Sequence, residues 1–169
     1  MKKYFVFFAM ITVLAASLLT SCKKDDDDDN PLLSTASMTC QVDGNSWAAV
    51  TRVTRHSLTT QTYTITGTDA SGAVIVITIR GEAVGTYSSS TSIDSLNAQV
   101  GAVYQPDASS PATDNYFSKS GTVTISSLDE TNKKVSGTFS FSLTKSGTAM
   151  SITNGKFTDL SYSESSDSN

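Results

Sequence analysis

Residues 135–144 read Val-Ser-Gly-Thr-Phe-Ser-Phe-Ser-Leu-Thr, with apolar residues or glycine alternating with serine or threonine. Successive side chains of a β-strand point to opposite faces of the sheet. This period of two therefore places Phe139, Phe141 and Leu143 on one face and hydroxyl groups on the other. Such a strand is buried on one face and meets water on the other. The stretch predicts an antiparallel strand that covers a core.

The same alternation of β-branched, aromatic and hydroxyl-bearing residues recurs on both sides of this stretch. The strands that it predicts are Met38–Val42, Trp47–Thr54, Gln61–Asp69, Ala73–Arg80, Gly85–Tyr87, Ala98–Gln105, Gly121–Ser127, Lys134–Thr144, Ala149–Asn154 and Lys156–Tyr162. Tight turns are predicted at Asp43-Gly44, Ser71-Gly72 and Ser146-Gly147. No stretch has a long helical period. The sequence thus predicts an all-β antiparallel sandwich or flattened barrel of about 8–10 strands.

Local departures from the alternation are also informative. Leu128 is out of step with Ile125, and Phe157 is out of step with Leu160. One extra residue in one strand of an antiparallel pair shifts the alternation in this way, so we expect a β-bulge or a strand end at both places. Residues 73–77 are apolar at every position, which is typical of a central strand.

The N-terminus has the composition of a secretory signal. Two lysines precede an apolar run from Tyr4 to Leu18, which is too short to span a bilayer comfortably. Residues 19–22, Leu-Thr-Ser-Cys, resemble the lipobox of bacterial lipoproteins. The resemblance implies that residues 1–21 are a signal peptide and that Cys22 is acylated at its thiol and its amino group. Three acyl chains are a lasting membrane anchor, whereas one is marginal. The alternative is an ordinary secretory signal followed by an incidental cysteine.

A run of charges follows the cysteine directly. A block of like charges cannot fold on itself, so residues 22–37 are expected to be a lipidated acidic tether. The order Lys23, Lys24, Asp25, Asp26, Asp27 resembles the export signal of Bacteroidetes-type lipoproteins, which implies an outer-membrane protein that faces the exterior. A solubilising spacer and a weak calcium-binding tract are the alternatives.

The domain itself is expected over residues 38–162, followed by a disordered, serine-rich tail over 163–169. The domain holds eight basic and nine acidic residues, so it offers no basic surface to nucleic acid. If Cys22 is acylated, Cys40 is the one remaining cysteine and cannot form an intramolecular disulfide. Its place in an alternating strand predicts a buried, unreactive thiol.

Three segments of the C-terminal half carry a resemblance: Gly121–Asp129, Val135–Phe141 and Ile152–Phe157. Together with Val42–Trp47, they resemble a family of Bacteroidetes-type surface lipoproteins of unknown function. The resemblance covers most of residues 38–162 and rests mainly on turns and strand alternation. It implies a β-rich surface domain, and it implies no catalytic residues.

Residues suited to catalysis are few. His56 is the single histidine, which excludes a multi-histidine metal site, and no cofactor motif is present. We interpret His56, close to Arg52 and Arg55, as a surface residue. A catalytic triad on His56 or a pair of carboxylates remains the enzymatic alternative. The candidate carboxylates are Asp43, Asp69, Glu82, Asp94 and Asp129. Several of them lie in expected turns, where aspartate accepts hydrogen bonds from backbone amides.

Two long polar connections, Ser88–Asn97 and Gln105–Tyr116, favour a binding role. Four aromatic residues lie in or near these connections, where a sugar or a peptide could stack on them. For one of the four, Trp47, we favour a position in the core over a surface binding role. These residues are Trp47, Tyr104, Tyr116 and Phe117. We therefore predict a non-enzymatic surface lipoprotein that binds a glycan, a peptide or a partner protein through its loops. The alternatives are an anchored hydrolase and a structural subunit of a surface complex.

The lipobox gives the first testable prediction. The mature protein is expected to begin at an acylated Cys22, found by mass spectrometry, and to partition into detergent because of its acyl chains. Cys22→Ala should leave unprocessed or water-soluble protein. Detergent partitioning of this variant equal to that of the wild type would contradict the prediction.

Overall fold

The hydroxyl-rich stretch forms strand β8 (Lys134–Lys145), and its apolar residues face the interior of a β-barrel. The computed structural model describes residues 36–89, 99–109 and 112–166. In β8, Phe139 and Leu143 are buried, whereas the residues that precede them, Thr138 and Ser142, are exposed. The alternation predicted from the sequence is confirmed.

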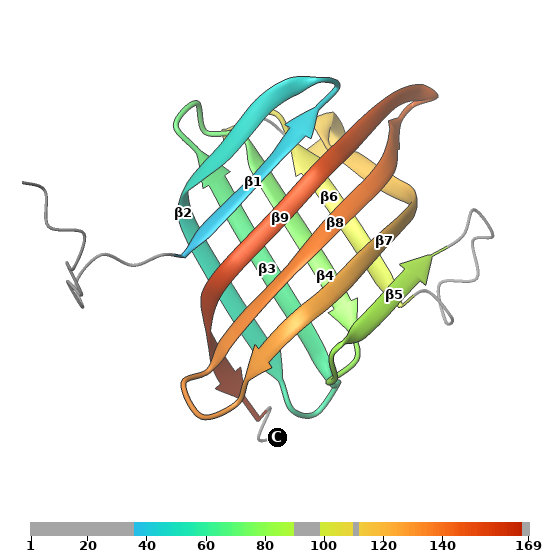
Figure 1. The fold of residues 1–169 in the computed structure, drawn as a ribbon. Helices are drawn as coiled ribbons and strands as arrows, with labels where there is room; N and C mark the ends of the chain where they lie inside the picture. Colours follow the sequence, from blue (N-terminus) through green and yellow to red (C-terminus); the bar gives the residue numbers. More distant parts are fainter. Residues whose placement is uncertain (1–35, 90–98, 110–111, 167–169) are drawn as a thin grey trace, which may run out of the picture. The chain divides into compact units, whose positions relative to one another are not determined.

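Figure 1 shows how the strands tilt around the barrel. The other strands in the described residues are β1 (Ser37–Val42), β2 (Asn45–Ser57), β3 (Thr62–Asp69), β4 (Val74–Arg80), β5 (Gly85–Ser89), β6 (Val100–Gln105), β7 (Tyr116–Asp129) and β9 (Thr148–Ser165). A short 3-10 helix, η1 (Ala112–Asp114), precedes β7. Eight strands close the barrel in the order β1, β2, β3, β4, β6, β7, β8, β9, and β5 pairs with β7 as an extra strand. The all-β prediction is confirmed, and of its two forms the barrel is the correct one.

Closure of the barrel joins the first strands to the last. β9 pairs antiparallel with β1, and beyond the start of β1 it pairs in parallel with residues 54–57 of β2. The predicted tail is therefore wrong in its first three residues, because Ser163, Glu164 and Ser165 pair with β2. The polar composition of residues 163–165 suits a strand at the end of the barrel as well as it suits a tail.

The predicted turns and bulges are largely confirmed. Asp43-Gly44 and Ser146-Gly147 connect hairpins, and all four residues have positive φ. The β7–β8 register shifts between Ile125 and Ser127, next to Leu128. The β8–β9 register shifts twice, and Asn154 and Asp159 have positive φ at these shifts. The prediction of two separate strands over residues 149–162 is wrong, because a bulge bends β9 without ending it.

β4 is a central strand between β3 and β6, as predicted. Its inward residues, Ile75, Ile77 and Ile79, are completely buried, and the outward Val74 and Val76 are half-buried. β7 begins at Tyr116 instead of Gly121, so Tyr116 and Phe117 belong to a strand and not to a loop. The polar residues between them and Gly121 hid this part of the strand.

Large apolar side chains fill the barrel. The largest that are fully buried are Tyr63, Phe157, Met38, Ile65, Ile75, Ile77, Ile79, Ile125, Leu143, Ile152, Val123 and Val135. Eight strands enclose a space that side chains can fill or that can hold one small ligand. Here side chains fill it.

Three glycines make room for three phenylalanine rings in β7, β8 and β9. The register places each glycine opposite one phenylalanine: Gly121 opposite Phe141, Gly137 opposite Phe157, and Gly155 opposite Phe139. A Cβ atom at any of these glycines would collide with the ring opposite, and at Gly137 also with the carbonyl oxygen of Thr124. Aromatic side chains that cover glycines in this way are a known means of building a curved sheet.

Gly137→Ala tests the role of these pairs. Because the added methyl group meets both a ring and a backbone oxygen, we expect a loss of about 1–3 kcal/mol in the free energy of unfolding, measured in urea. Gly85→Ala is the matched control, since nothing lies within 4 Å of a Cβ at that strand position. Equal losses in the two variants would contradict the steric role of the glycine.

Candidate functional site

Two polar and aromatic clusters lie toward opposite ends of β4. Tyr104 pairs with Ile75 near the start of β4, and Tyr63, the neighbour of His56, pairs with Ile79 near its end. We call the first group, Tyr104, Asp114, Tyr116 and Lys145, the tyrosine cluster. We call the second, His56, Tyr63, Glu82, Lys133, Tyr162 and Glu164, the histidine cluster.

The tyrosine cluster contains two of the predicted binding residues. Tyr104 of β6 and Tyr116 of β7 are directly opposite each other, with ring centroids 6.3 Å apart. The Nζ atom of Lys145 lies 5.6 Å from the centroid of Tyr116 and donates a hydrogen bond of 3.0 Å to Asp114 Oδ1. A lysine held over an aromatic face by a carboxylate orders this end of the barrel.

Burial limits what the tyrosine cluster can contact. Both rings are half-buried and pack against the core. Burial, followed by the charge of Asp69, raises the pKa of Tyr104, so its phenol stays protonated at neutral pH. Only part of each ring is therefore left for contact with a ligand.

The other two predicted binding residues lie elsewhere. Phe117 points to the outer side of β7 and is 54% exposed, while its neighbour Tyr116 points inward. Trp47 is only 5% exposed, which confirms its assignment to the core. The alternative prediction, that Trp47 is a surface binding residue, is therefore wrong. The same interior buries the Cys40 thiol, as predicted, and desolvation raises the pKa of Cys40 to about 12.

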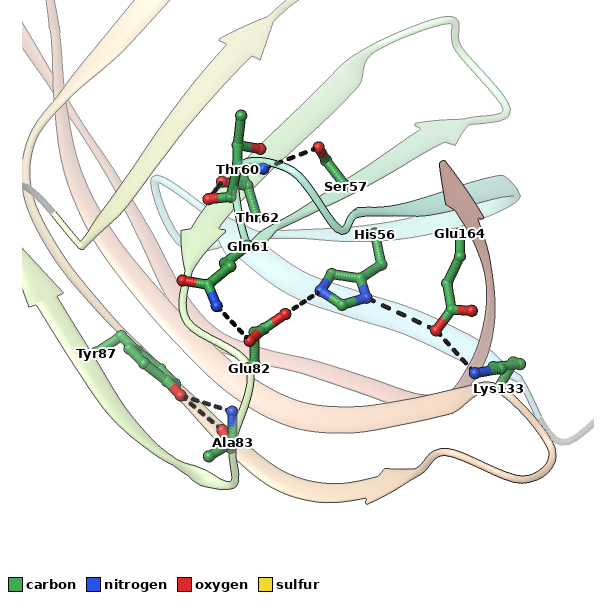
Figure 2. Close-up of polar contacts among 10 residues, drawn as sticks. All are labelled: His56, Ser57, Thr60, Gln61, Thr62, Glu82, Ala83, Tyr87, Lys133 and Glu164. Carbon is green, nitrogen blue, oxygen red and sulfur yellow. Dashed lines mark hydrogen bonds and ion pairs between the residues drawn. The ribbon is translucent and has the colours of Figure 1, made fainter. Parts of the chain in front are cut away.

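The histidine cluster was missed at the sequence level. His56 is 5% exposed, so its interpretation as a surface residue is wrong. Its Nε2 atom lies 3.4 Å from Glu82 Oε1, and its Nδ1 atom lies 3.9 Å from Glu164 Oε1. Neither contact has hydrogen-bond geometry, and both ring nitrogens are buried. Figure 2 shows the imidazole between the two carboxylates.

Further hydrogen bonds position the two carboxylates. Gln61 Nε2 donates to Glu82 Oε2 at 2.7 Å, and Lys133 Nζ donates to Glu164 Oε1 at 2.7 Å (Figure 2). The bond from Lys133 lowers the pKa of Glu164. A lowered pKa stabilises the fold while the carboxylate is ionised. This contribution is present above the ordinary value of 4.5 and is lost as the pH falls through the lowered pKa.

Tyrosine rings enclose His56 on its other sides. The imidazole stacks on Tyr63 with centroids 4.1 Å apart and planes 7° apart, and Tyr162 meets it edge-on at 5.9 Å. Burial, together with a hydrogen bond to Tyr162, raises the pKa of Tyr63. Because the ring is held on all sides and its nitrogens face carboxylates, the arrangement suits a fixed structural imidazole better than a catalytic base.

Three of the carboxylates considered for catalysis, Asp43, Asp69 and Asp129, accept hydrogen bonds from backbone amides. Asp69 Oδ1 accepts hydrogen bonds from the backbone amides of Ser71 and Ala73, and Asp129 and Asp43 accept backbone amides in the same way. These bonds confirm the prediction that aspartates in the turns accept hydrogen bonds from backbone amides. Asp94 lies outside the described residues, as do Cys22 and the charged run after it.

Residues 36–89, 99–109 and 112–166 contain no group of three or more His, Cys, Asp or Glu side chains arranged to hold a metal ion. The same ranges contain no helix that is long and apolar enough to cross a membrane.

A bulge explains why His56 was misjudged. Trp47 and Ala49 point inward, the register of β2 shifts around Val50, and from there Thr54 and His56 point inward. The sequence gives no local sign of this phase, because the apolar Val53 is 52% exposed and the polar Thr54 beside it is buried. Glu82 reaches the histidine from the segment between β4 and β5, and Glu164 reaches it from β9, which one sequence cannot reveal.

The fold and its two clusters define a small, closed β-barrel domain with a filled interior. Residues 34–161 match a family described as a domain of unknown function (DUF6252), and the chain belongs to this family. No curated protein and no solved structure matches the chain.

Substitution of His56 separates packing from polarity. His56→Phe keeps a ring on Tyr63 and removes two buried nitrogens that have no hydrogen bond. We therefore expect the free energy of unfolding at neutral pH to stay within about 1 kcal/mol of the wild type. His56→Ala removes the ring and should cost about 2–4 kcal/mol. Equal losses for Phe and Ala, measured in urea, would contradict this and show that the imidazole nitrogens stabilise the fold.

Proposed function

We propose that this protein is a lipid-anchored lipoprotein of the outer membrane whose barrel faces the exterior and binds a glycan, a peptide or a partner protein without catalysing a reaction. The lipobox at Cys22 and the order of charges from Lys23 to Asp27 support the anchor and the location. The filled barrel supports the binding mode, because recognition is left to the outer surface and the ends of the strands.

The tyrosine cluster is the end of the barrel that best suits such binding. Tyr104 and Tyr116 are partly exposed there, and Phe117 adds an exposed ring on the adjoining outer face. Aromatic residues with one polar end are typical of surfaces that bind sugars and peptides. Lys145 is neutralised by Asp114, so the cluster favours a neutral ligand.

A glycan array and cell-surface extracts, probed with the purified full chain, test this proposal. A hit should weaken about fivefold in Tyr116→Ala and in Phe117→Ala, because one aromatic contact contributes about 1 kcal/mol. Tyr116→Phe should retain binding by stacking. Val53→Ala is the matched control, since Val53 is 52% exposed on a different part of the barrel.

Two outcomes would overturn the proposal. Unchanged affinity in both aromatic variants, with folding checked by circular dichroism, would exclude the tyrosine cluster and Phe117 as the site. A hydrolysed ligand, detected by mass spectrometry after incubation with the wild type, would replace binding with catalysis.

A further inference from the structure

Hydroxyl groups form ordered rows on the outer face of β7 and β8, which lie beside β9 on the near side of the barrel in Figure 1. The register aligns Thr124, Thr138 and Lys156 in one row, and Thr122 and Ser140 in the next. Side chains directly opposite each other on neighbouring strands have Cβ atoms about 5 Å apart. The rows extend onto β5, where the Oγ1 atoms of Thr86 and Thr124 are 3.0 Å apart.

This face is hollowed around the bulge in β9. The hollow has a volume of about 450 Å³ and is lined by Thr122, Thr124, Thr138, Ser140, Asn154 and Lys156, with the backbone of β8 and β9 at Phe139 and Gly155. Asn154 lies at the bulge with φ of 53°, and its Nδ2 atom donates to Gln41 Oε1 at 2.8 Å. The volume of the hollow is within the range of small-ligand sites.

The chemistry of the lining is polar with one positive charge. Threonine and serine hydroxyls both donate and accept hydrogen bonds, as the hydroxyls of a sugar do. No carboxylate lines the hollow among the described residues. Lys133 and Lys145 are each paired with an acidic residue, whereas Lys156 has no ion pair with any described residue.

We propose that this hollow, the hydroxyl groove, binds a saccharide that carries a carboxylate. The threonine and serine hydroxyls bond the hydroxyls of the sugar, and the Lys156 ammonium pairs with its carboxylate. The groove and the tyrosine cluster are separate sites, so this inference does not depend on the neutral ligand proposed for that cluster.

Calorimetric titration of the purified full chain with a short oligogalacturonate tests the groove, and the methyl-esterified oligomer serves as the uncharged comparison. The wild type should bind the acid form more tightly. Lys156→Gln should weaken binding of the acid form about tenfold and abolish the preference for it, because it removes one charge-assisted hydrogen bond. Thr138→Val keeps the shape and the strand preference of the residue, and it should weaken the binding of both the acid and the ester.

Matched variants make the test specific. Lys134→Gln removes a charge from the neighbouring strand β8, outside the groove, and Thr64→Val removes an outward hydroxyl from β3. Both variants should bind like the wild type. Tyr116→Ala should also leave this binding unchanged, which separates the groove from the tyrosine cluster.

Three results would overturn the proposal. The first is no binding by the wild type at millimolar ligand. The second is equal binding of the acid and the ester, and the third is a loss in Lys134→Gln as large as in Lys156→Gln. The third result would reduce the interaction to general charge attraction, which would also fall steeply with added salt.

Discussion

The fold depends on steric fit between three glycines and three phenylalanine rings. Each ring lies over a glycine directly opposite it on the neighbouring strand, and no other residue leaves space for it. Phe139, Phe141 and Phe157 thereby enter an interior that is narrow in an eight-stranded barrel. The same contacts let β7, β8 and β9 curve without leaving cavities, which a close-packed interior does not tolerate cheaply.

Filling the interior determines where function can reside. The strands give their inward positions to packing, so only outward positions and strand ends remain for recognition. At one end, tyrosine rings and a paired lysine leave a neutral surface, and at the other an enclosed histidine connects β2 with β9 and with the segment after β4. Successive residues of a strand point to opposite faces. The pattern that buries the phenylalanines on the inner face of β8 therefore also places the rows of threonine and serine on the outer face of β7 and β8.

The fold was predictable to a greater extent than the sites. Alternation in residues 135–144 and glycines in tight turns determine strands and hairpins locally, so the all-β class followed from the sequence. Barrel closure was not predictable, because it depends on pairing of β9 with β1 and β2 across most of the chain. His56 was misjudged because a bulge near Val50 reverses the phase of β2, and its acidic neighbours come from distant segments. The pairing of Tyr104 with Tyr116 was not predicted, because it and the half-buried positions of both rings depend on tertiary packing.

The seam between the first and last strands has a consequence for folding kinetics. Asp43, in the first turn, accepts a hydrogen bond from the amide of Ser151, 108 residues later, and the parallel ladder of β2 with β9 spans a similar separation. The hairpins can form as they are synthesised, but the ring cannot close until β9 has emerged. Topologies rich in such non-local contacts fold slowly. Nascent chains therefore remain open for the whole of synthesis, and a chain truncated before β9 would expose the edges of β1 and β8 to aggregation.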